Sequence, residues 1–301
     1  MTQARSLVLL FLFLCLSLAA PATVWAQADS PRQLLARMAQ ANRTLDYRGV
    51  FTHEYAGALA SLAIVHAVRD GREYQKIVHL NGTPREWLRV NSLACRRAAD
   101  QLLAATHLAG AEVERHYRLW VKGEDRVAGR PVRILHAIPE DPYRYGQVLA
   151  LDRETGLLLQ ALVVDAEGKV LERFQFAEIQ YGLAPEEIAA LAEERAAEEP
   201  CGALAEDEQL VGWLPPGFRL LGRREAEREL ALLFGDGLAF FSVVIGAPLP
   251  TGPRPLFLRR GATGVWFAEV GGEIPVGVVG EVPARTLERV AATVRVAGVR
   301  P

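Results

Sequence analysis

The sequence has few cysteines and almost no net charge. It contains 3 cysteines in 301 residues, and its formal net charge at pH 7 is −2. So few cysteines exclude a small scaffold held together mainly by disulfides. The lack of a basic excess argues against nucleic acid or an anionic membrane surface as the partner.

Beyond its N-terminus the sequence also lacks an apolar run that could cross a bilayer. The best candidate, residues 230–249, is interrupted by the turn signal Gly235-Asp236-Gly237. A charge at the bilayer centre costs about 2.5 kcal/mol or more. We therefore expect no membrane-spanning helix in the mature chain.

The first residues follow the pattern of a secretory signal. Arg5 precedes an apolar core at residues 7–20, which is too short to span a bilayer comfortably. Small residues favour cleavage after Ala26 or Ala28. We predict that residues 1–26 are a signal peptide and that the mature protein is exported in soluble form.

The familiar catalytic motifs are missing. There is no G-x-S-x-G nucleophile elbow, phosphate-binding loop or Rossmann glycine pattern. His53 and Glu54 begin like a zinc-binding helix motif, but Gly57 stands where the second histidine is needed. Asp152 and Glu154 flank a predicted turn, where carboxylates commonly make local hydrogen bonds, and nothing places them across a substrate as in a glycosidase. The sequence predicts no catalytic residue, no metal site and no cofactor.

Two cysteines remain once the predicted signal peptide is removed. An exported protein meets oxidising conditions, in which cysteines can pair. Cys95 and Cys201 are therefore a candidate disulfide, and the sequence leaves open whether their side chains meet.

The rest of the sequence consists mainly of strand patterns after one helix. Ser30 is a good N-cap and Pro31 suits the first helical position. Alternating residues then predict an antiparallel meander over residues 47–93, and further strands up to residue 178. Residues 97–110 are predicted to form a helix or a loop that covers the sheet.

A change of composition marks a domain boundary. Alanine and glutamate dominate the start of residues 183–211, which we interpret as a solvated helix or linker. After it, six predicted strands and a closing helix at residues 284–294 form a second unit. The sequence therefore predicts an α+β protein with a large domain at 27–182 and a small α+β domain at 212–301.

One motif allows two interpretations. In residues 140–146, the side chains of Tyr143 and Tyr145 would share one face of a strand, and Arg144 would take the other. Tyrosine and arginine are common in binding hot spots, so the three residues could anchor a partner. They could equally fix the start of the following strand.

Nine segments occur in the order in which one bacterial family has them. They are YRGVF (47–51), IVH (64–66), LNGTPREWLR (80–89), GEDRVAGRP (123–131), DPYRYG (141–146), LALDRETGLLLQALVVDAEGKVLERFQF (149–176), LPPGF (214–218), DGLAFFSVVI (236–245) and VVGEVPARTLERVA (278–291). Together they resemble the RseB/MucB family, periplasmic regulators of the envelope-stress sigma factor sigma-E. The resemblance runs over nearly all of the predicted mature chain.

The resemblance implies both a fold and a partner. The large domain would be similar to the lipoprotein carriers LolA and LolB, a curved antiparallel half-open barrel with helices on its concave face. The small domain would be the main grip on the periplasmic part of a transmembrane anti-sigma factor of the RseA/MucA type. Binding would shield that factor from site-1 proteolysis, and lipopolysaccharide or other acylated amphiphiles would loosen the complex. The sequence leaves open whether the protein forms a homo-oligomer.

Three sets of residues follow from this reading. Structural family motifs supply Asp125, Arg126, Gly129, Arg130, Asp141, Tyr143, Arg144, Tyr145 and Gly146. Strands that are apolar on both faces suggest a lipid cavity lined by Leu149, Leu151, Leu157, Leu159, Trp87 and Trp120. Candidate partner contacts are Phe240, Phe241, Arg259 and Arg260, with one of the two phenylalanines expected in the core because strand neighbours face opposite ways.

Other classes of function remain as alternatives. A lipid or lipoprotein carrier of the LolA/LolB type would share the large domain, but it has no need of residues 212–301. An exported hydrolase would need a triad or a metal cluster, which the sequence does not offer. A polysaccharide-binding envelope protein is a third alternative.

Overall fold

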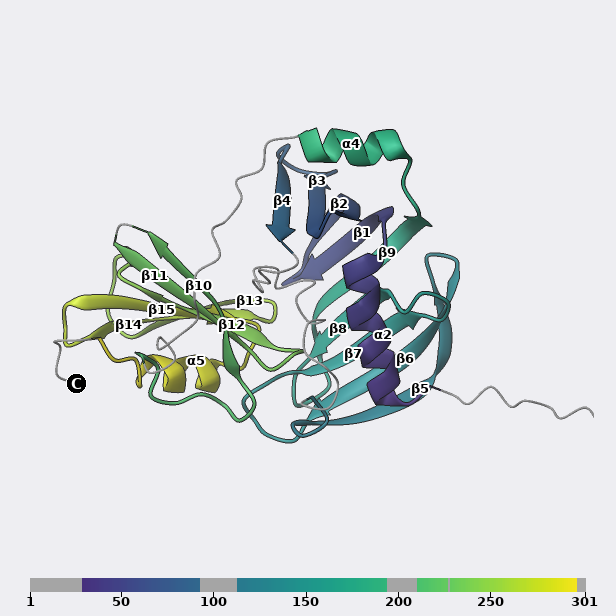
Figure 1. Cartoon of the computed structure of the whole chain (residues 1–301). Coiled ribbons are helices and arrows are strands. Elements are labelled where there is room, and N and C mark those ends of the chain that lie inside the picture. The colour runs from purple at the N-terminus through teal and green to yellow at the C-terminus, as the bar shows by residue number, and fades with distance from the viewer. Residues whose placement is uncertain (1–28, 93–112, 194–209, 227, 297–301) are drawn as a thin grey trace, which may run out of the picture.

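The structure is a computed structural model in which two antiparallel sheets, of nine and six strands, lie side by side (Figure 1). It describes residues 29–92, 113–193, 210–226 and 228–296. Both Cys95 and Cys201, like the predicted signal peptide and the segment 97–110, lie outside these residues. Among the described helices, none is long and apolar enough to cross a membrane.

The larger sheet is a curled meander. Its strands are β1 (Tyr47–Tyr55), β2 (Ala58–Arg69), β3 (Arg72–His79), β4 (Glu86–Ser92), β5 (Tyr117–Val127), β6 (Arg130–Pro139), β7 (Gly146–Asp152), β8 (Leu158–Val164) and β9 (Val170–Tyr181). They pair in the order β4-β3-β2-β1-β9-β8-β7-β6-β5. Strand β5 also approaches β9, although three strands separate them in the sheet, so the sheet must curve strongly. Because β4 and β5 remain its two edges, the predicted half-open curved sheet is confirmed.

Helix α2 (Pro31–Thr44) fills the concave side of this sheet (Figure 1). The Ser30 hydroxyl accepts from the backbone N–H of Gln33 at 3.2 Å, and the Gln33 side chain accepts from the Ser30 N–H at 2.7 Å. This capping box satisfies two N–H groups that the first turn leaves unpaired. Leu34, Leu35 and Met38, each at most 3% exposed, face the sheet. The helix predicted to begin after Ser30 is confirmed.

Glycine allows one close approach where the sheet bends. The pairing of β1 with β9 shifts register between Val50 and Phe51, which is the mark of a β-bulge. A Cβ at the adjacent Gly49 would lie 2.4 Å from the carbonyl oxygen of Glu178 and 2.8 Å from the ring of Phe176. Only glycine fits between these strands without moving one of them.

Helix α4 (Pro185–Glu193) packs on the outside of the first strands (Figure 1). Ile188 and Leu191 are 8% and 5% exposed and lie against Ala67, Tyr74 and Val90. The predicted helix is present at the start of 183–211, but the description of it as solvated is wrong for its inner face. That face buries its apolar side chains against β2, β3 and β4, which come from the N-terminal part of the large domain.

The smaller sheet forms a separate core with one helix. Its strands are β10 (Arg219–Ala226), β11 (Glu229–Gly235), β12 (Phe240–Ile245), β13 (Leu256–Arg260), β14 (Thr263–Val270) and β15 (Ile274–Gly280), in the order β10-β11-β12-β15-β14-β13. Helix α5 (Ala284–Ala291) packs on β14 and β15. Its Leu287 and Val290 are fully buried among Phe234, Phe241 and Val278. This is the small α+β unit that the sequence predicts.

Candidate functional site: a polar seam between the two domains

The two domains meet along a surface that we call the seam. On the large domain, with the nine-stranded sheet, it comprises Tyr55, Tyr117, Tyr143, Arg144, Tyr145, Gln147 and Glu172. On the small domain, with the six-stranded sheet, it comprises Trp213, Pro216, Asp236, Leu238, Arg259, Arg260, Ala262, Thr286 and Arg289. The family motif at residues 141–146 supplies the centre of the seam.

Arg144 joins the domains through a fully buried guanidinium. Its Nη1 donates to Oδ2 of Asp236 at 2.5 Å, and its Nη2 donates to Oδ2 of Asp141 at 2.9 Å and to the Pro216 carbonyl at 2.6 Å. The side chains of Arg144 and Asp236 are both 0% exposed. A buried ion pair offsets its desolvation cost only when its remaining donors and acceptors are also satisfied. The neighbours of this pair meet that condition.

Asp236 is held by donors from both domains. It accepts from the backbone N–H groups of Leu238 at 2.9 Å and Ala239 at 2.8 Å, and from the hydroxyl of Tyr117 at 3.1 Å. Burial, with the nearby Asp236 carboxylate, raises the pKa of Tyr117 well above its ordinary value. The hydroxyl of Tyr117 therefore keeps its proton and remains a donor. Asp236 lies in the turn after β11, so one carboxylate connects a turn of the small domain to β5 of the large one.

Tyr143 attaches helix α5 to the large domain. Its backbone carbonyl accepts from the Thr286 hydroxyl at 2.8 Å, and its phenolic oxygen accepts from Nη1 of Arg289 at 2.6 Å. Its ring meets that of Trp213 edge-on at 5.0 Å, and the Arg289 guanidinium lies 4.0 Å from the Trp213 ring centre. The sequence left open whether the 140–146 motif anchors a partner or fixes the start of a strand. In the structure, Tyr143 and Arg144 hydrogen-bond to the protein's own small domain.

Apolar packing continues across the seam. Nε2 of Gln147 donates to the Leu238 carbonyl at 2.6 Å. The Leu238 side chain, 3% exposed, packs with Leu149 and Leu158 of the large domain. The two domains therefore share part of one hydrophobic core as well as a buried ion pair.

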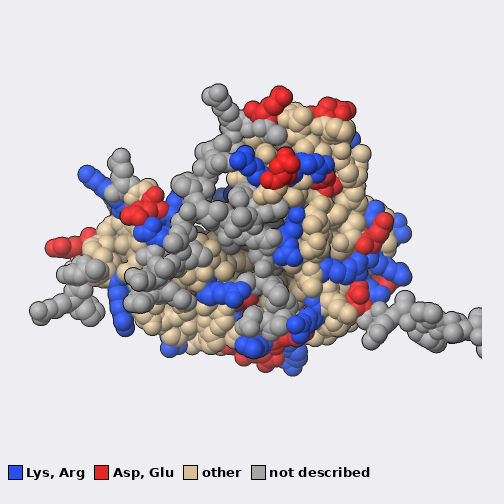
Figure 2. Space-filling model, in the orientation of Figure 1, with Lys and Arg blue, Asp and Glu red and all other residues tan. Residues whose placement is uncertain are grey.

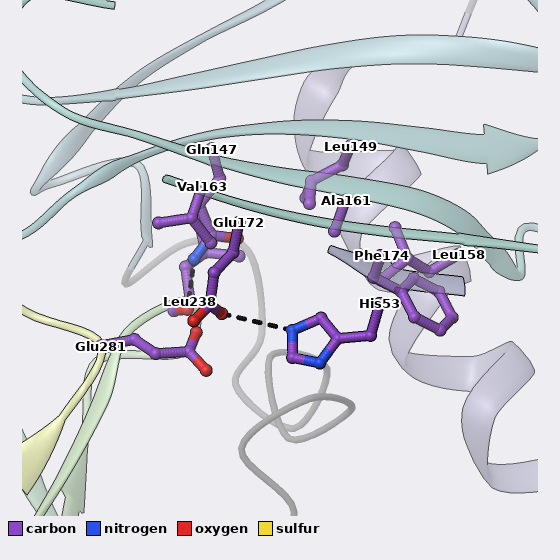
Figure 3. A pocket seen from close by; sticks show the side chains of 10 residues that line it. All are labelled: His53, Gln147, Leu149, Leu158, Ala161, Val163, Glu172, Phe174, Leu238 and Glu281. Atoms are coloured by element: carbon purple, nitrogen blue, oxygen red, sulfur yellow. Dashed lines mark hydrogen bonds and ion pairs between the residues drawn. The ribbon is translucent and has the colours of Figure 1, made fainter. Parts of the chain in front are cut away.

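A small cavity lies beside this packing (Figure 3). It has a volume of about 30 Å³, and His53, Glu172 and Glu281 point into it from β1, β9 and the end of β15. Nε2 of His53 lies 3.5 Å from Oε2 of Glu172, and Oε1 of Glu172 accepts from the backbone N–H of Ala262 at 3.2 Å. Burial, and then the neighbouring Glu172, raise the pKa of Glu281 to about 8. Ligand pockets usually measure 300 Å³ or more, so this cavity is too small for an acyl chain.

The candidate lipid-cavity residues do not come together. Leu149, Leu151, Leu157 and Leu159 are each at most 1% exposed and belong to the packed core. Trp87 and Trp120 are 40% and 39% exposed and lie on β4 and β5, the opposite edges of the large sheet. Each indole instead contacts a histidine ring, His79 or His136. Lipid binding by these residues stays a prediction.

The candidate partner contacts divide into two pairs. Phe240 and Phe241 are 4% and 0% exposed, so both rings lie in the small domain. Phe241 follows the expected alternation, and Leu221 with Leu233 covers Phe240 on the other face. Neither ring is exposed to a partner in this structure. The burial of one ring was expected, and the burial of the second corrects the expectation that the other would be exposed. Arg259 and Arg260 are exposed, and they also reach the large domain, because Arg259 hydrogen-bonds Tyr145 and Arg260 lies over the Tyr55 ring at 4.5 Å.

The GEDRVAGRP motif builds a hairpin and a buried carboxylate site. Nη2 of Arg126, next to Asp125, donates to the carbonyl of Gly129 at 2.5 Å, and Gly129 has a φ of 73° at the tip of the β5–β6 hairpin. Arg130 pairs with Asp152 and lies over the Tyr181 ring at 4.7 Å. These residues have structural roles.

The carboxylate of Asp152 accepts hydrogen bonds from its own turn and from Arg130. Besides Arg130, the backbone N–H groups of Glu154 at 2.8 Å and Thr155 at 3.0 Å donate to it. Burial opposes ionisation, but these hydrogen bonds outweigh it and lower the pKa of Asp152. The interpretation of Asp152 and Glu154 as turn residues is confirmed. In the part of the chain that the structure describes, no group of three or more His, Cys, Asp or Glu side chains is placed to hold a metal ion.

The sequence drew attention to only part of the seam. It singled out Tyr143, Arg144 and Tyr145, and Arg259 with Arg260, but it gave no functional role to Asp236, Gln147 or Glu281. A usable signal was present, because Asp236 is a lone charge between the apolar strands β11 and β12. A buried charge needs a counter-charge, so a buried aspartate at this position predicts that a basic side chain from elsewhere in the chain pairs with it.

On the visible face of the molecule, basic and acidic residues occur side by side over both domains (Figure 2). This mixed surface agrees with the small net charge. It gives no reason to expect a strongly charged polymer as the partner.

Comparison with known proteins gives consistent matches over the chain. The MucB/RseB N-terminal domain profile matches residues 30–197, and the MucB/RseB C-terminal domain profile matches residues 205–295. The sigma factor AlgU regulatory protein MucB of Pseudomonas aeruginosa is 36% identical over 318 residues, which cover 95% of this chain and 96% of that protein. The sigma-E factor regulatory protein RseB of Haemophilus influenzae is 25% identical, over 97% and 99% of the two chains.

Solved structures agree with these matches. A crystal structure of MucB in complex with MucA(peri) has 35% identity and a TM-score of 0.66, and covers 88% of this chain and 98% of that one. A crystal structure of MucB has 34% identity and a TM-score of 0.68, with 88% and 97% covered. Both the sequence matches and the structural matches span the two domains, and on these grounds the chain belongs to the MucB/RseB family.

Proposed function

We propose that this protein binds the periplasmic part of a transmembrane anti-sigma factor of the RseA/MucA type and shields it from site-1 proteolysis, which keeps a sigma-E-type factor inactive. The observation that carries the proposal is the match, over both domains, to a MucB structure in complex with MucA(peri). The protein acts as a regulator by binding and not by catalysis.

Two features of the structure support a binding role that uses both domains together. The seam fixes the small domain against the large one through a buried ion pair, a tyrosine anchor and shared apolar packing. The exposed Arg259 and Arg260 lie at the edge of this seam, where a partner could touch both domains at once. We propose them as partner contacts, and we no longer propose Phe240 and Phe241.

The proposal places the protein in the periplasm. It requires that residues 1–26 direct export and are then removed. N-terminal sequencing of the protein purified from the periplasmic fraction tests this step. A mature chain that still begins at Met1 would contradict it.

Proteolysis in vitro tests the function itself. The mature protein, an anti-sigma periplasmic domain and a site-1 protease are mixed, and cleavage of the anti-sigma domain is followed over time. We expect saturating protein to slow cleavage at least tenfold, which corresponds to about 1.4 kcal/mol of differential binding. A denatured sample of the same protein is the control, and unchanged cleavage at saturation would overturn the proposal.

A second function, sensing of lipopolysaccharide or other acylated amphiphiles, also remains a proposal. A ligand can release the anti-sigma factor only if it binds the released state more tightly. Because the core of the large domain is packed, the exposed Trp87 and Trp120 at the sheet edges are the better candidates for contact. Titration calorimetry with lipopolysaccharide fragments tests binding, and the absence of heat at concentrations that disrupt the complex would contradict it.

A further inference from the structure

Two carboxylates face each other across the seam. Glu281 follows β15 of the small domain, and its backbone N–H donates to the Phe240 carbonyl at 3.2 Å. Glu172 comes from β9 of the large domain, with a side chain only 6% exposed. Both line the same cavity of about 30 Å³, as Figure 3 shows. The space between them is too small to hydrate two negative charges fully.

Among the residues that the structure describes, the surroundings of this pair offer little positive charge. His53 of β1 lies 3.5 Å from Glu172 and becomes a cation only when protonated. Arg259 lies near Tyr145, which also interacts with Glu172. The other described side chains that line the cavity are uncharged: Gln147, Leu149, Leu158, Ala161, Val163, Phe174 and Leu238. Two ionised glutamates here would repel each other with weak compensation.

We propose that Glu281, Glu172 and His53 form a proton-operated latch, which holds the two domains together while the carboxylate pair keeps a proton and loosens the seam when both carboxylates ionise. The latch is separate from the Arg144–Asp236 pair, in which the carboxylate faces a guanidinium at 2.5 Å and not a second carboxylate. The proposal does not depend on the proposed function.

The direction of the effect follows from the protonation of Glu281. Its pKa is raised to about 8 in the closed seam from an ordinary value of 4.5, first by burial and then by Glu172. The closed state therefore binds a proton more tightly than an open one. The stabilisation is complete below about pH 4.5 and is lost as the pH rises through about 8.

Hydrogen exchange of the full mature chain tests the latch. The backbone N–H of Ala262 donates to Glu172, so it exchanges when the seam opens. We expect its protection factor, corrected for the intrinsic rate, to fall on the order of tenfold per pH unit between pH 6 and 8. The amide of Val243, in the middle of the small sheet, should keep its protection and serves as the internal reference.

Variants make the test specific. Glu281→Gln removes the titrating group and keeps its shape, so we expect the pH dependence at Ala262 to disappear. Glu167→Gln alters an exposed carboxylate in the β8–β9 turn and should leave the pH dependence as in the wild type. If Glu281→Gln does not fold, Glu172→Gln takes its place; burial still raises the pKa of Glu281 in that variant, so we expect the fall in protection to become smaller and not to disappear. A flat profile in the wild type, or an undiminished slope in the folded Gln variant, would overturn the proposal.

Discussion

At the scale of single residues, Arg144 decides how firmly the domains are joined. Its guanidinium is fully buried and donates to Asp141, to Asp236 and to a backbone carbonyl. Such a group is stable only as part of a complete set, because a buried cation without its anion is costly. Asp236 therefore contributes more to the stability of the protein than a turn residue usually does, because it supplies the counter-charge for Arg144.

We expect Asp236→Ala to lower the free energy of unfolding by about 3–5 kcal/mol, because it leaves Arg144 short of a counter-charge and removes the acceptor for two backbone N–H groups. Urea denaturation of the purified protein measures this change. Glu154→Ala is the matched control, since that side chain is 80% exposed although it also pairs with an arginine. Its effect should stay within about 0.5 kcal/mol.

A second substitution separates the ion pair from the turn. In an Arg144→Met background, Asp236→Ala should cost less than in the wild type, because no unpaired cation remains. Equal costs in the two backgrounds would mean that the loss comes from the turn around Asp236 alone.

At the scale of elements, helix α4 depends on packing and not on its own sequence. It has 9 residues, and isolated helices of this length are marginal in water. Ile188 and Leu191 hold it against Ala67, Tyr74 and Val90. These contacts, and not helix propensity, keep residues 185–193 helical.

We expect Leu191→Ala to detach α4 locally while the sheets remain folded. Loss of a buried leucine costs about 2 kcal/mol or more, which corresponds to a fall of roughly 30-fold in the hydrogen-exchange protection of residues 185–193. Ala190→Ser, on the exposed face, should leave the protection unchanged. Equal protection in Leu191→Ala and in the wild type would show that other contacts hold the helix.

Local patterns predicted the elements well, and the site only in part. The N-cap at Ser30 and the alternation in the strands act within a few residues, so they are readable in the sequence. The inner face of α4 was missed because Ala67 and Tyr74 are far away in the chain. The motif around Arg144 attracted attention for its composition, but its partner Asp236 lies 92 residues further on. No spacing rule connects two such positions.

At the scale of the whole molecule, the seam makes one unit of two domains. Each domain has its own core, yet Leu238 of the small domain is buried in the core of the large one. The buried pair and the anchored helix α5 add to this connection. Opening the seam would therefore expose apolar surface and an ion pair together.

We expect a single calorimetric unfolding transition for the wild-type mature protein at pH 6. Disruption of the seam by Asp236→Ala should produce two transitions, because each domain then unfolds by itself. Differential scanning calorimetry distinguishes the two cases. Two separate transitions in the wild type would show that the seam contributes little to cooperativity.

The hydrogen-bonding partners of Arg144 are synthesised at different times. A chain that is synthesised from its N-terminus delivers Arg144 and Asp141 well before Asp236 and Pro216. Until those later residues arrive, the large domain carries an arginine with one of its three hydrogen-bonding partners, and the apolar surface around Leu149 that Leu238 covers stays open. A truncated chain stays in that condition permanently. The seam therefore makes a complete protein distinguishable from an incomplete one, because only the incomplete chain leaves this arginine and this apolar surface uncovered.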